Sequence, residues 1–243
     1  VHVIVDGGEG WGAAVTIPHD KVRVSFAIPW EGKLLLGTTD TLHEGPPEEA
    51  AVTEEDVQTI LDEARVAVHD LGAVRASFHG LRVLPLGRGG TANARRETVY
   101  TRGPAGMLSV AGGKLTTYRR IALDALEQLG VQNLNRTPRP LPGATGLAHI
   151  PWPVELEPAT RRHLIHLYGS LAPEVLAPAR EEAWLLEPIV PGRPDNRAED
   201  RYARTHEWAR SDEDVRRRRT TVWLEGDSTE RSKEWNQSPA VSH

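Results

Sequence analysis

The stretch LSVAGGKLTTYR, residues 108–119, joins an apolar strand to a helix through two adjacent glycines. The run MLSVA at 107–111 is short and apolar, which predicts a fully buried strand. Behind the glycines, apolar side chains recur at helical spacing at Tyr118, Ile121, Ala122, Ala125, Leu126 and Leu129. A strand, a glycine turn and a helix in this order can bring backbone N–H groups to a ligand. A P-loop is excluded, because Leu115 follows Lys114 where a P-loop carries Ser or Thr.

Strand patterns dominate the residues before this stretch. In VHVIV, residues 1–5, the valines alternate with other residues, which places His2 on the face opposite the valines. KVRVSFAIP at 21–29 alternates in the same way and predicts a half-buried antiparallel strand. Its apolar face consists of Val22, Val24, Phe26 and Ile28. KLLLG at 33–37 follows a Glu-Gly pair, so the two segments predict a hairpin.

A capping box predicts one amphipathic helix in this first part. Thr53 and Asp56 occupy the reciprocal positions of the box. Apolar residues then recur at helical spacing at Val57, Ile60, Leu61, Ala64 and Val68, which predicts about four turns of helix. Further strand-like pieces lie around 74–78, 81–86 and 97–101.

The pattern becomes helical after a linker rich in proline and glycine at 131–153. Pro158 suits a first helical turn, and a second helix is expected from Ala198 to Arg210. Ser211 is expected to cap a third helix, with Asp214 in the reciprocal position of a capping box. The chain from residue 226 onward is polar without periodicity, and we expect disorder there.

Composition excludes several classes of function. None of the 243 residues is cysteine, which removes disulfides and thiolate chemistry. The formal net charge of −5 argues against a general nucleic-acid binder, and we interpret the run Arg216–Arg219 as a solvated helix face. No stretch approaches the roughly 20 apolar residues of a membrane-spanning helix. The chain opens within a strand pattern and its single methionine is Met107, so we expect the later part of a longer protein or a truncated product.

One pair of histidines has the spacing of metal ligands. His163 and His166 stand three residues apart on a predicted helix, and no acidic residue or third histidine follows at matching spacing. We therefore predict that the chain has no metal site.

Three stretches in a fixed order carry a family resemblance: IPWEGKLLLGTTDT at 28–41, SFHGLRVLPL at 77–86 and LSVAGGKLTTYR at 108–119. Together they resemble the FAD-dependent glycerol-3-phosphate dehydrogenases of the bacterial type. The resemblance covers most of residues 1–130 and continues more loosely to about residue 224, through AEDRYARTHEWARSDEDVRRRRT.

The resemblance implies an α+β fold: an antiparallel-sheet substrate domain, the closing strand and helix of a flavin-binding α/β domain, and a small all-α C-terminal domain. The implied parts are residues 1–105 for the substrate-binding sheet, 106–130 for the last strand and helix of the FAD domain, 131–153 for a proline-rich linker, 154–225 for the C-terminal helical domain and 226–243 for a disordered tail. The family's first segment carries G-x-G-x-x-G for the FAD pyrophosphate, and this sequence has no such motif between a strand and a helix.

The reaction that the resemblance implies is oxidation of the C2 hydroxyl of sn-glycerol 3-phosphate to dihydroxyacetone phosphate, with hydride transfer to FAD and electrons passed to quinone. It also implies a cytoplasmic protein. The resemblance is compatible with peripheral association of the intact enzyme with the inner face of the cell membrane, and with a homodimer. No nucleic-acid partner and no metal are implied.

Site residues follow from matching the family motifs. Arg82 would contact the substrate phosphate, and Arg96 would share that duty. Lys114 would lie near both flavin and substrate, and His2 would take the proton of the C2 hydroxyl. Backbone contacts to the flavin would come from Gly112, Gly113, Leu115 and Thr116.

Two alternatives stay open at this point. One is a non-catalytic remnant or interaction module that retains the fold of the substrate domain. The other is an oxidase that passes its electrons to oxygen. Because the sequence contributes contacts only to the isoalloxazine side, we expect the 243-residue chain alone to bind FAD weakly or not at all and to show no activity. Visible flavin absorption of the purified chain checks this expectation.

Overall fold

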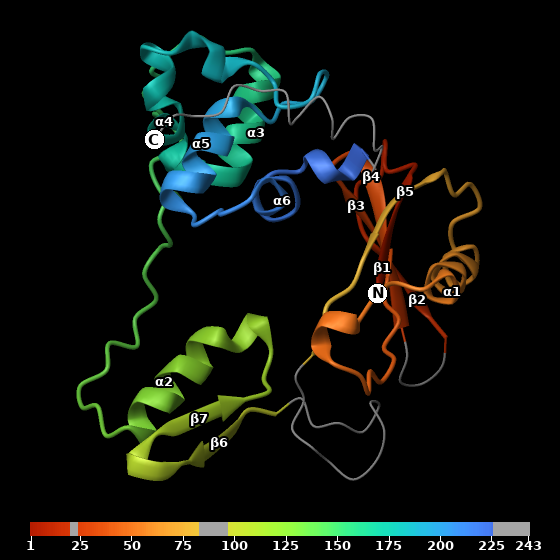
Figure 1. The fold of residues 1–243 in the computed structure, drawn as a ribbon, viewed down its shortest axis with the longest axis vertical. Coiled ribbons are helices and arrows are strands. Elements are labelled where there is room, and N and C mark those ends of the chain that lie inside the picture. The colour runs from red at the N-terminus through yellow and green to blue at the C-terminus, as the bar shows by residue number, and fades with distance from the viewer. Residues whose placement is uncertain (20–23, 83–96, 226–243) are drawn as a thin grey trace. The chain divides into compact units, whose positions relative to one another are not determined.

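The computed structural model describes residues 1–19, 24–82 and 97–225, and its ribbon is shown in Figure 1. Contacts divide the chain into two compact units, Val1–Pro138 and Arg139–His243. The architecture is mixed α+β, as the sequence predicts, with the strands in the first unit and most of the helical residues in the second.

An antiparallel sheet forms the centre of the first unit. Its strands are β1 (His2–Asp6), β2 (Val15–Pro18), β3 (Val24–Trp30), β4 (Lys33–Gly37) and β5 (Val74–Phe78), in the order β2-β3-β4-β1-β5. The predicted hairpin is β3–β4. Its turn residues Glu31 and Gly32 both have positive φ, 50° and 73°, as a two-residue type I′ turn requires.

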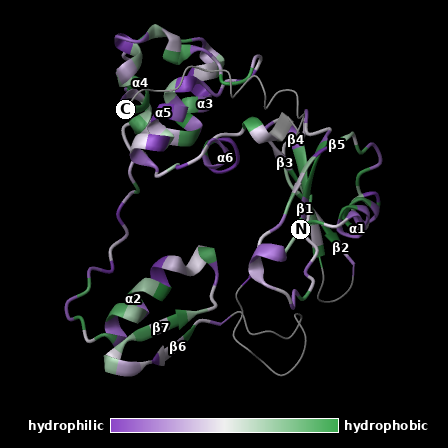
Figure 2. Ribbon diagram, in the orientation of Figure 1, coloured by the Kyte–Doolittle hydropathy of each residue, from purple (hydrophilic) through white to green (hydrophobic). Residues whose placement is uncertain are grey.

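Strand β1 lies between β4 and β5 and is buried on both faces. Val3, Ile4 and Val5 are all fully buried, although alternation alone predicts one buried face. Figure 2 shows how hydrophobic residues concentrate along the strands of this sheet. Because β1 is a central strand, its polar residue His2 has a paired strand on each side, β4 and β5.

Helix α1 (Glu54–Ala64) covers one face of the sheet. The shared core consists of Val3, Val5, Ala27, Leu34, Leu36, Ile60, Ala64 and Val68. The predicted capping box is confirmed: the Asp56 N–H donates to Thr53 Oγ1 at 3.1 Å, and the Thr53 N–H donates to Asp56 Oδ2 at 3.2 Å. The helix is 11 residues long, about three turns rather than four. Val68 reaches the core from beyond the helix end.

The orientation expected for 21–29 is wrong. Ala27 is fully buried and Ser25 is 3% exposed, whereas Phe26 is 38% exposed. The reason is that α1 packs on the Ala27 face, where a small side chain allows close approach of the helix. The larger apolar residues of β3 lie on the opposite, open face of the sheet. Residues 20–23 lie outside the described ranges.

The capping box of α1 is expected to contribute to the stability of the chain. Thr53→Ala removes the acceptor for the Asp56 N–H, and it is expected to lower the free energy of unfolding by about 1 kcal/mol. Thr53→Ser retains the hydroxyl and is expected to match the unsubstituted chain. Urea unfolding of the three proteins checks both expectations. An equal midpoint for Thr53→Ala and the unsubstituted chain would show that the box contributes nothing.

The rest of the first unit is a β-hairpin with a helix. Strands β6 (Val99–Arg102) and β7 (Leu108–Ala111) pair with each other, and α2 (Tyr118–Gln128) follows. The expectation of a fully buried strand at 107–111 is wrong: Met107 is 60% exposed and Val110 is 43% exposed. Within the described residues, β7 has β6 as its single neighbour, so one edge stays open.

The prediction of a strand at 81–86 is also wrong for the two residues of this segment that the structure describes. Residues 81–82 lie outside any strand, and residues 83–96 lie outside the described ranges. The strand expected at 97–101 is present as β6.

The second unit is helical, as predicted. It contains α3 (Pro158–Tyr168), α4 (Ala172–Leu176), α5 (Arg197–His206) and α6 (Asp212–Asp214), followed by a π-helical turn, Val215–Arg219. Its core consists of Leu164, Tyr168, Ala172, Val175, Leu176, Ala179, Leu185 and Ala198. Pro158 in the first turn of α3 and the capping box of Ser211 with Asp214 are both confirmed. Helix α5 ends before the expected Arg210.

Shorter 3₁₀ turns complete the description: Pro47–Glu49, Pro104–Gly106, Leu115–Thr117, Gly169–Leu171, Ala177–Arg180, Ala183–Leu186 and Val222–Glu225. Residues 131–153, predicted as a linker, contain neither helix nor strand. The helices in the described ranges are all too short or too polar to cross a membrane. The tail expected to be disordered, 226–243, lies outside the described residues.

Candidate functional site

His2 lies near one end of the sheet, on the face opposite α1. It pairs with Gly37 of β4 on one side and with Phe78 of β5 on the other. Its imidazole stacks on the Phe78 ring, with ring centroids 5.1 Å apart and an interplanar angle of 11°. The stacking contact with Phe78 therefore fixes the plane of the His2 ring.

Gly37 gives the His2 ring its space. A Cβ atom at position 37 would lie 2.6 Å from Cδ2 of His2, closer than two carbon atoms can approach. The imidazole thus occupies the place that a side chain at this position of β4 would fill. Any larger residue would push the ring off Phe78.

The electrostatic surroundings of His2 favour the neutral imidazole. Burial lowers the pKa of His2 below its ordinary value, and the positive charge of Arg82 acts in the same direction. A neutral imidazole can accept a proton, so the environment suits a general base.

Arg82, the predicted phosphate ligand, is held beside the same end of the sheet. Its Nη1 lies 2.9 Å from Oδ2 of Asp40, and both side chains remain partly exposed. Asp40 follows β4 by three residues, and Arg82 follows β5 by four. The ion pair therefore joins the ends of the strands that flank His2. The structure brings His2 and Arg82, two of the predicted site residues, together.

A hydrogen bond ties this region to α1. Thr39 Oγ1 donates to Asp56 Oδ1 at 3.0 Å, so the carboxylate of the capping box also fixes the segment between Gly37 and Asp40. Burial raises the pKa of Asp56, but hydrogen bonds from Thr53 and Thr39 outweigh it, and the net direction is a lowered pKa. The carboxylate stays ionised and holds both partners.

The other predicted site residues that the structure describes lie on the turn between β7 and α2. Gly112 and Gly113 have φ of 76° and 83°, and Lys114, Leu115 and Thr116 are exposed. A 3₁₀ turn, Leu115–Thr117, precedes α2, and the amide of Thr117 donates to the Lys114 carbonyl at 3.0 Å.

Gly113 has an internal packing role as well. A Cβ there would lie 2.5 Å from Cδ1 of Ile121 and 2.8 Å from Oγ1 of Thr98. Glycine therefore lets α2 pack closely on the hairpin. Arg96, the second predicted phosphate ligand, lies outside the described residues.

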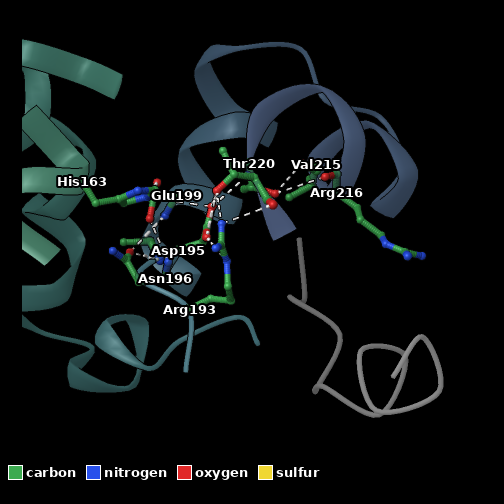
Figure 3. A network of polar contacts seen from close by, with 10 residues as sticks. His163, Arg193, Asp195, Asn196, Glu199, Val215, Arg216 and Thr220 are labelled. Carbon is green, nitrogen blue, oxygen red and sulfur yellow. Dashed lines mark hydrogen bonds and ion pairs between the residues drawn. The ribbon is translucent and has the colours of Figure 1, made fainter. Parts of the chain in front are cut away.

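A buried polar cluster in the second unit was missed by the sequence argument. His163 of α3 approaches Asp195 and Glu199, which lie before and in α5, as Figure 3 shows. Its Nε2 lies 2.9 Å from Oε1 of Glu199 and 3.9 Å from Oδ1 of Asp195. Spacing within one helix could not reveal acidic partners that come from a segment more than thirty residues away. The signal that could have found Glu199 is its capping-box position after Asn196.

A family profile matches the C-terminal part of the chain. A profile described as the C-terminal domain of alpha-glycerophosphate oxidase matches residues 118–234. The match begins at α2 and runs through the whole described part of the helical unit.

Curated relatives match over most of this chain. The glycerol-3-phosphate dehydrogenase of Synechocystis is 30% identical over 252 residues, covering 91% of this chain and 44% of the relative. That of Mycobacterium leprae is 32% identical over 245 residues, covering 93% and 41%. The chain thus spans less than half the length of these relatives.

A solved structure shows the same fold. The X-ray structure of the glycerol-3-phosphate dehydrogenase from Bacillus halodurans, complexed with FAD, superposes with a TM-score of 0.63 at 23% identity. It covers 97% of this chain, which covers 49% of that one. The profile match and the curated matches agree, and the chain is a homologue of the glycerol-3-phosphate dehydrogenase family that covers a portion of the length of the full enzymes.

Proposed function

We propose that the gene product containing this chain oxidises sn-glycerol 3-phosphate to dihydroxyacetone phosphate with FAD and passes the electrons to quinone. The observation that supports the proposal is that His2, on the open face of the sheet, lies within the electrostatic influence of Arg82, which an ion pair with Asp40 holds at the same end of the sheet. A neutral base and a cation at the same end of a sheet suit a substrate that has a hydroxyl next to a phosphorylated carbon.

The proposed parts of the chain are those implied by the family. Residues 1–105 supply the substrate-binding sheet, 106–130 the closing strand and helix of the flavin domain, and 154–225 the C-terminal helical domain. The proposal includes a cytoplasmic location with peripheral association at the inner face of the membrane, and a homodimer.

Arg82 binds the substrate phosphate in this proposal. Its guanidinium is partly exposed and oriented by Asp40 through Nη1. A guanidinium has donors on several edges, so it can keep one contact with a carboxylate while it binds a phosphate with others. Asp40 therefore acts as a positioning residue for Arg82.

His2 accepts the proton of the C2 hydroxyl in this proposal. Stacking on Phe78 fixes the ring plane, and burial keeps the imidazole unprotonated at neutral pH. The base is then ready before substrate arrives, and substrate binding need not first remove a proton from it.

The turn after β7 fits one edge of a flavin. Two glycines with positive φ and an exposed segment from Lys114 to Thr116 leave backbone and side-chain donors accessible to a planar ring. FAD, when bound, supplies the acceptor for the hydride of C2. Lys114 offers a cation to the substrate phosphate or to negative charge on the reduced ring.

Steady-state assays of the complete gene product test the proposal. With sn-glycerol 3-phosphate and a quinone analogue, we expect dihydroxyacetone phosphate to form, and sn-glycerol 1-phosphate serves as the matched control. Oxygen consumption without the quinone analogue would favour the oxidase instead. Absence of product with every acceptor would favour the non-catalytic module and contradict the proposal.

A further inference from the structure

The carboxylate of Asp56 binds two parts of the chain at once. One oxygen, Oδ2, closes the capping box of α1: it accepts from the Thr53 N–H at 3.2 Å and from Thr53 Oγ1 at 2.8 Å. The other oxygen, Oδ1, accepts from Thr39 Oγ1 at 3.0 Å. A capping box needs only the contacts within the first turn of its helix. The bond from Thr39 therefore serves something other than the helix cap.

Thr39 joins α1 to the start of β1. A carboxylate can only accept, so the single hydrogen of the Thr39 hydroxyl points to Asp56. The lone pairs of this hydroxyl then face the nitrogen of Val1, which lies 3.1 Å away. The backbone is tied to the same residue, since the Thr39 N–H donates to the Val1 carbonyl at 3.4 Å. Thr39 is thus held between the first turn of α1 and the residue that precedes β1.

Asp40, the partner of Arg82, follows Thr39 directly in the sequence. Its Oδ2 lies 2.9 Å from Nη1 of Arg82, and the two side chains are 37% and 47% exposed. An exposed ion pair contributes little to stability, because water screens the charges and two long side chains lose freedom when they pair. The pair can therefore fix the guanidinium of Arg82 only if the backbone fixes Asp40. The bond from Thr39 to Asp56 fixes this part of the backbone.

His2 is held by other contacts. Its backbone is part of the β1 ladder, where it pairs with Gly37 on one side and with Phe78 on the other. Its ring stacks on Phe78. Loss of the hydroxyl of Thr39 leaves the contact between the two rings in place. Arg82 and His2 thus depend on different parts of the fold, and they can be perturbed separately.

We propose that Thr39 and Asp56 are positioning residues for phosphate binding, and that they act through Asp40 on Arg82. This inference rests on the proposed function in one respect, namely that Arg82 binds the substrate phosphate. Asp56 holds Thr39, Thr39 places Asp40, and Asp40 orients the guanidinium. The first turn of α1, a helix that packs against the sheet as Figure 1 shows, thereby sets the geometry of the phosphate ligand at the end of that sheet.

A purely structural role for the bond between Thr39 and Asp56 would have a different consequence. In that case its loss would lower the free energy of unfolding and leave the affinity for a phosphorylated ligand unchanged. A positioning role predicts weaker binding of the ligand as well, and only in a protein that retains Arg82. The affinity for a phosphorylated ligand therefore separates the two roles.

Calorimetric titration of the complete gene product with dihydroxyacetone phosphate tests the proposal. This ligand carries the phosphate but has no C2 hydroxyl to oxidise, so the titration measures binding without turnover. Thr39→Val keeps the shape of the side chain and removes the hydroxyl. We expect Thr39→Val to raise Kd by roughly 3- to 30-fold, the range of coupling between groups in one network of contacts.

Four further variants separate positioning from stability. Thr39→Ser keeps the hydroxyl and is expected to restore the affinity of the unsubstituted protein. Thr53→Ala weakens the cap of the same helix but leaves the Thr53 N–H on Asp56, and it is expected to bind normally. Asp56→Glu keeps a capping box but moves the oxygen that Thr39 reaches, and it is expected to weaken binding. In an Arg82→Ala background, Thr39→Val is expected to add no further loss.

The outcomes also separate this inference from the proposed function. Unchanged affinity in Thr39→Val, an equal loss in Thr53→Ala, or a full further loss in the Arg82→Ala background would overturn the positioning role and leave the proposed function intact. A protein that shows the expected dependence on Thr39 but oxidises no sn-glycerol 3-phosphate would support the positioning role and contradict the proposed function. An unsubstituted protein that binds no dihydroxyacetone phosphate would contradict both.

Discussion

Replacing Arg82 by alanine in the complete gene product is expected to raise KM for sn-glycerol 3-phosphate strongly and to change kcat less. The change removes a charge-assisted contact to the phosphate, which should cost on the order of 2–4 kcal/mol, or roughly 30- to 1,000-fold in kcat/KM. Glycerol, which lacks the phosphate, is expected to lose far less. Parallel measurement of kcat/KM for both substrates separates the two cases.

The chain offers a matched control for this variant. Arg75 lies on β5, pairs with Asp6 and is exposed to a similar extent as Arg82, 45% against 47%. Arg75→Ala is expected to leave KM unchanged. Equal losses on glycerol and glycerol 3-phosphate in Arg82→Ala, or equal losses in the two arginine variants, would remove Arg82 from the phosphate site.

Replacing His2 by asparagine is expected to lower kcat by about 10²–10⁴-fold, the usual contribution of a positioned general base. KM is expected to change little, because the phosphate contact is kept. In the unsubstituted enzyme, activity should fall on the acid side as His2 takes up a proton. Since burial lowers the pKa of His2, this acid limb is expected below about pH 6.5.

The pH profile distinguishes a catalytic from a structural role for His2. In His2→Asn the acid limb assigned to this residue should disappear, whereas His43→Asn, at an exposed histidine, should keep it. A His2→Asn enzyme with the same limb and near-normal kcat would show that another group is the base.

Much of the fold could be predicted from local patterns. The capping boxes at Thr53 and Ser211 are present because each depends on residues three apart, within a single turn. The β3–β4 hairpin is also local, since two residues of its turn determine its geometry.

Burial could not be predicted in the same way. Alternation in β3 separates Phe26 from Ala27, but α1 selects the Ala27 face because a small side chain allows close packing. For β7, an apolar run predicts burial on both faces, yet exposure depends on how many strands flank it. Both outcomes depend on partners distant in sequence.

The candidate site, like the fold, could be predicted only in part from the sequence. Motif matching named His2 and Arg82, and the structure places them at one end of the sheet. Motif matching could not reveal that Gly37 and Phe78 hold the His2 ring, because these contacts come from neighbouring strands. The His163 cluster escaped for the same reason, since its acidic partners come from a different helix and the segment before it.

Anaerobic titration of the complete gene product with sn-glycerol 3-phosphate tests the central claim most directly. The account predicts a protein that binds FAD and whose visible flavin absorption bleaches on addition of substrate, with one dihydroxyacetone phosphate formed for each flavin reduced. A protein that binds FAD but retains its full visible absorption in the presence of excess sn-glycerol 3-phosphate would contradict it.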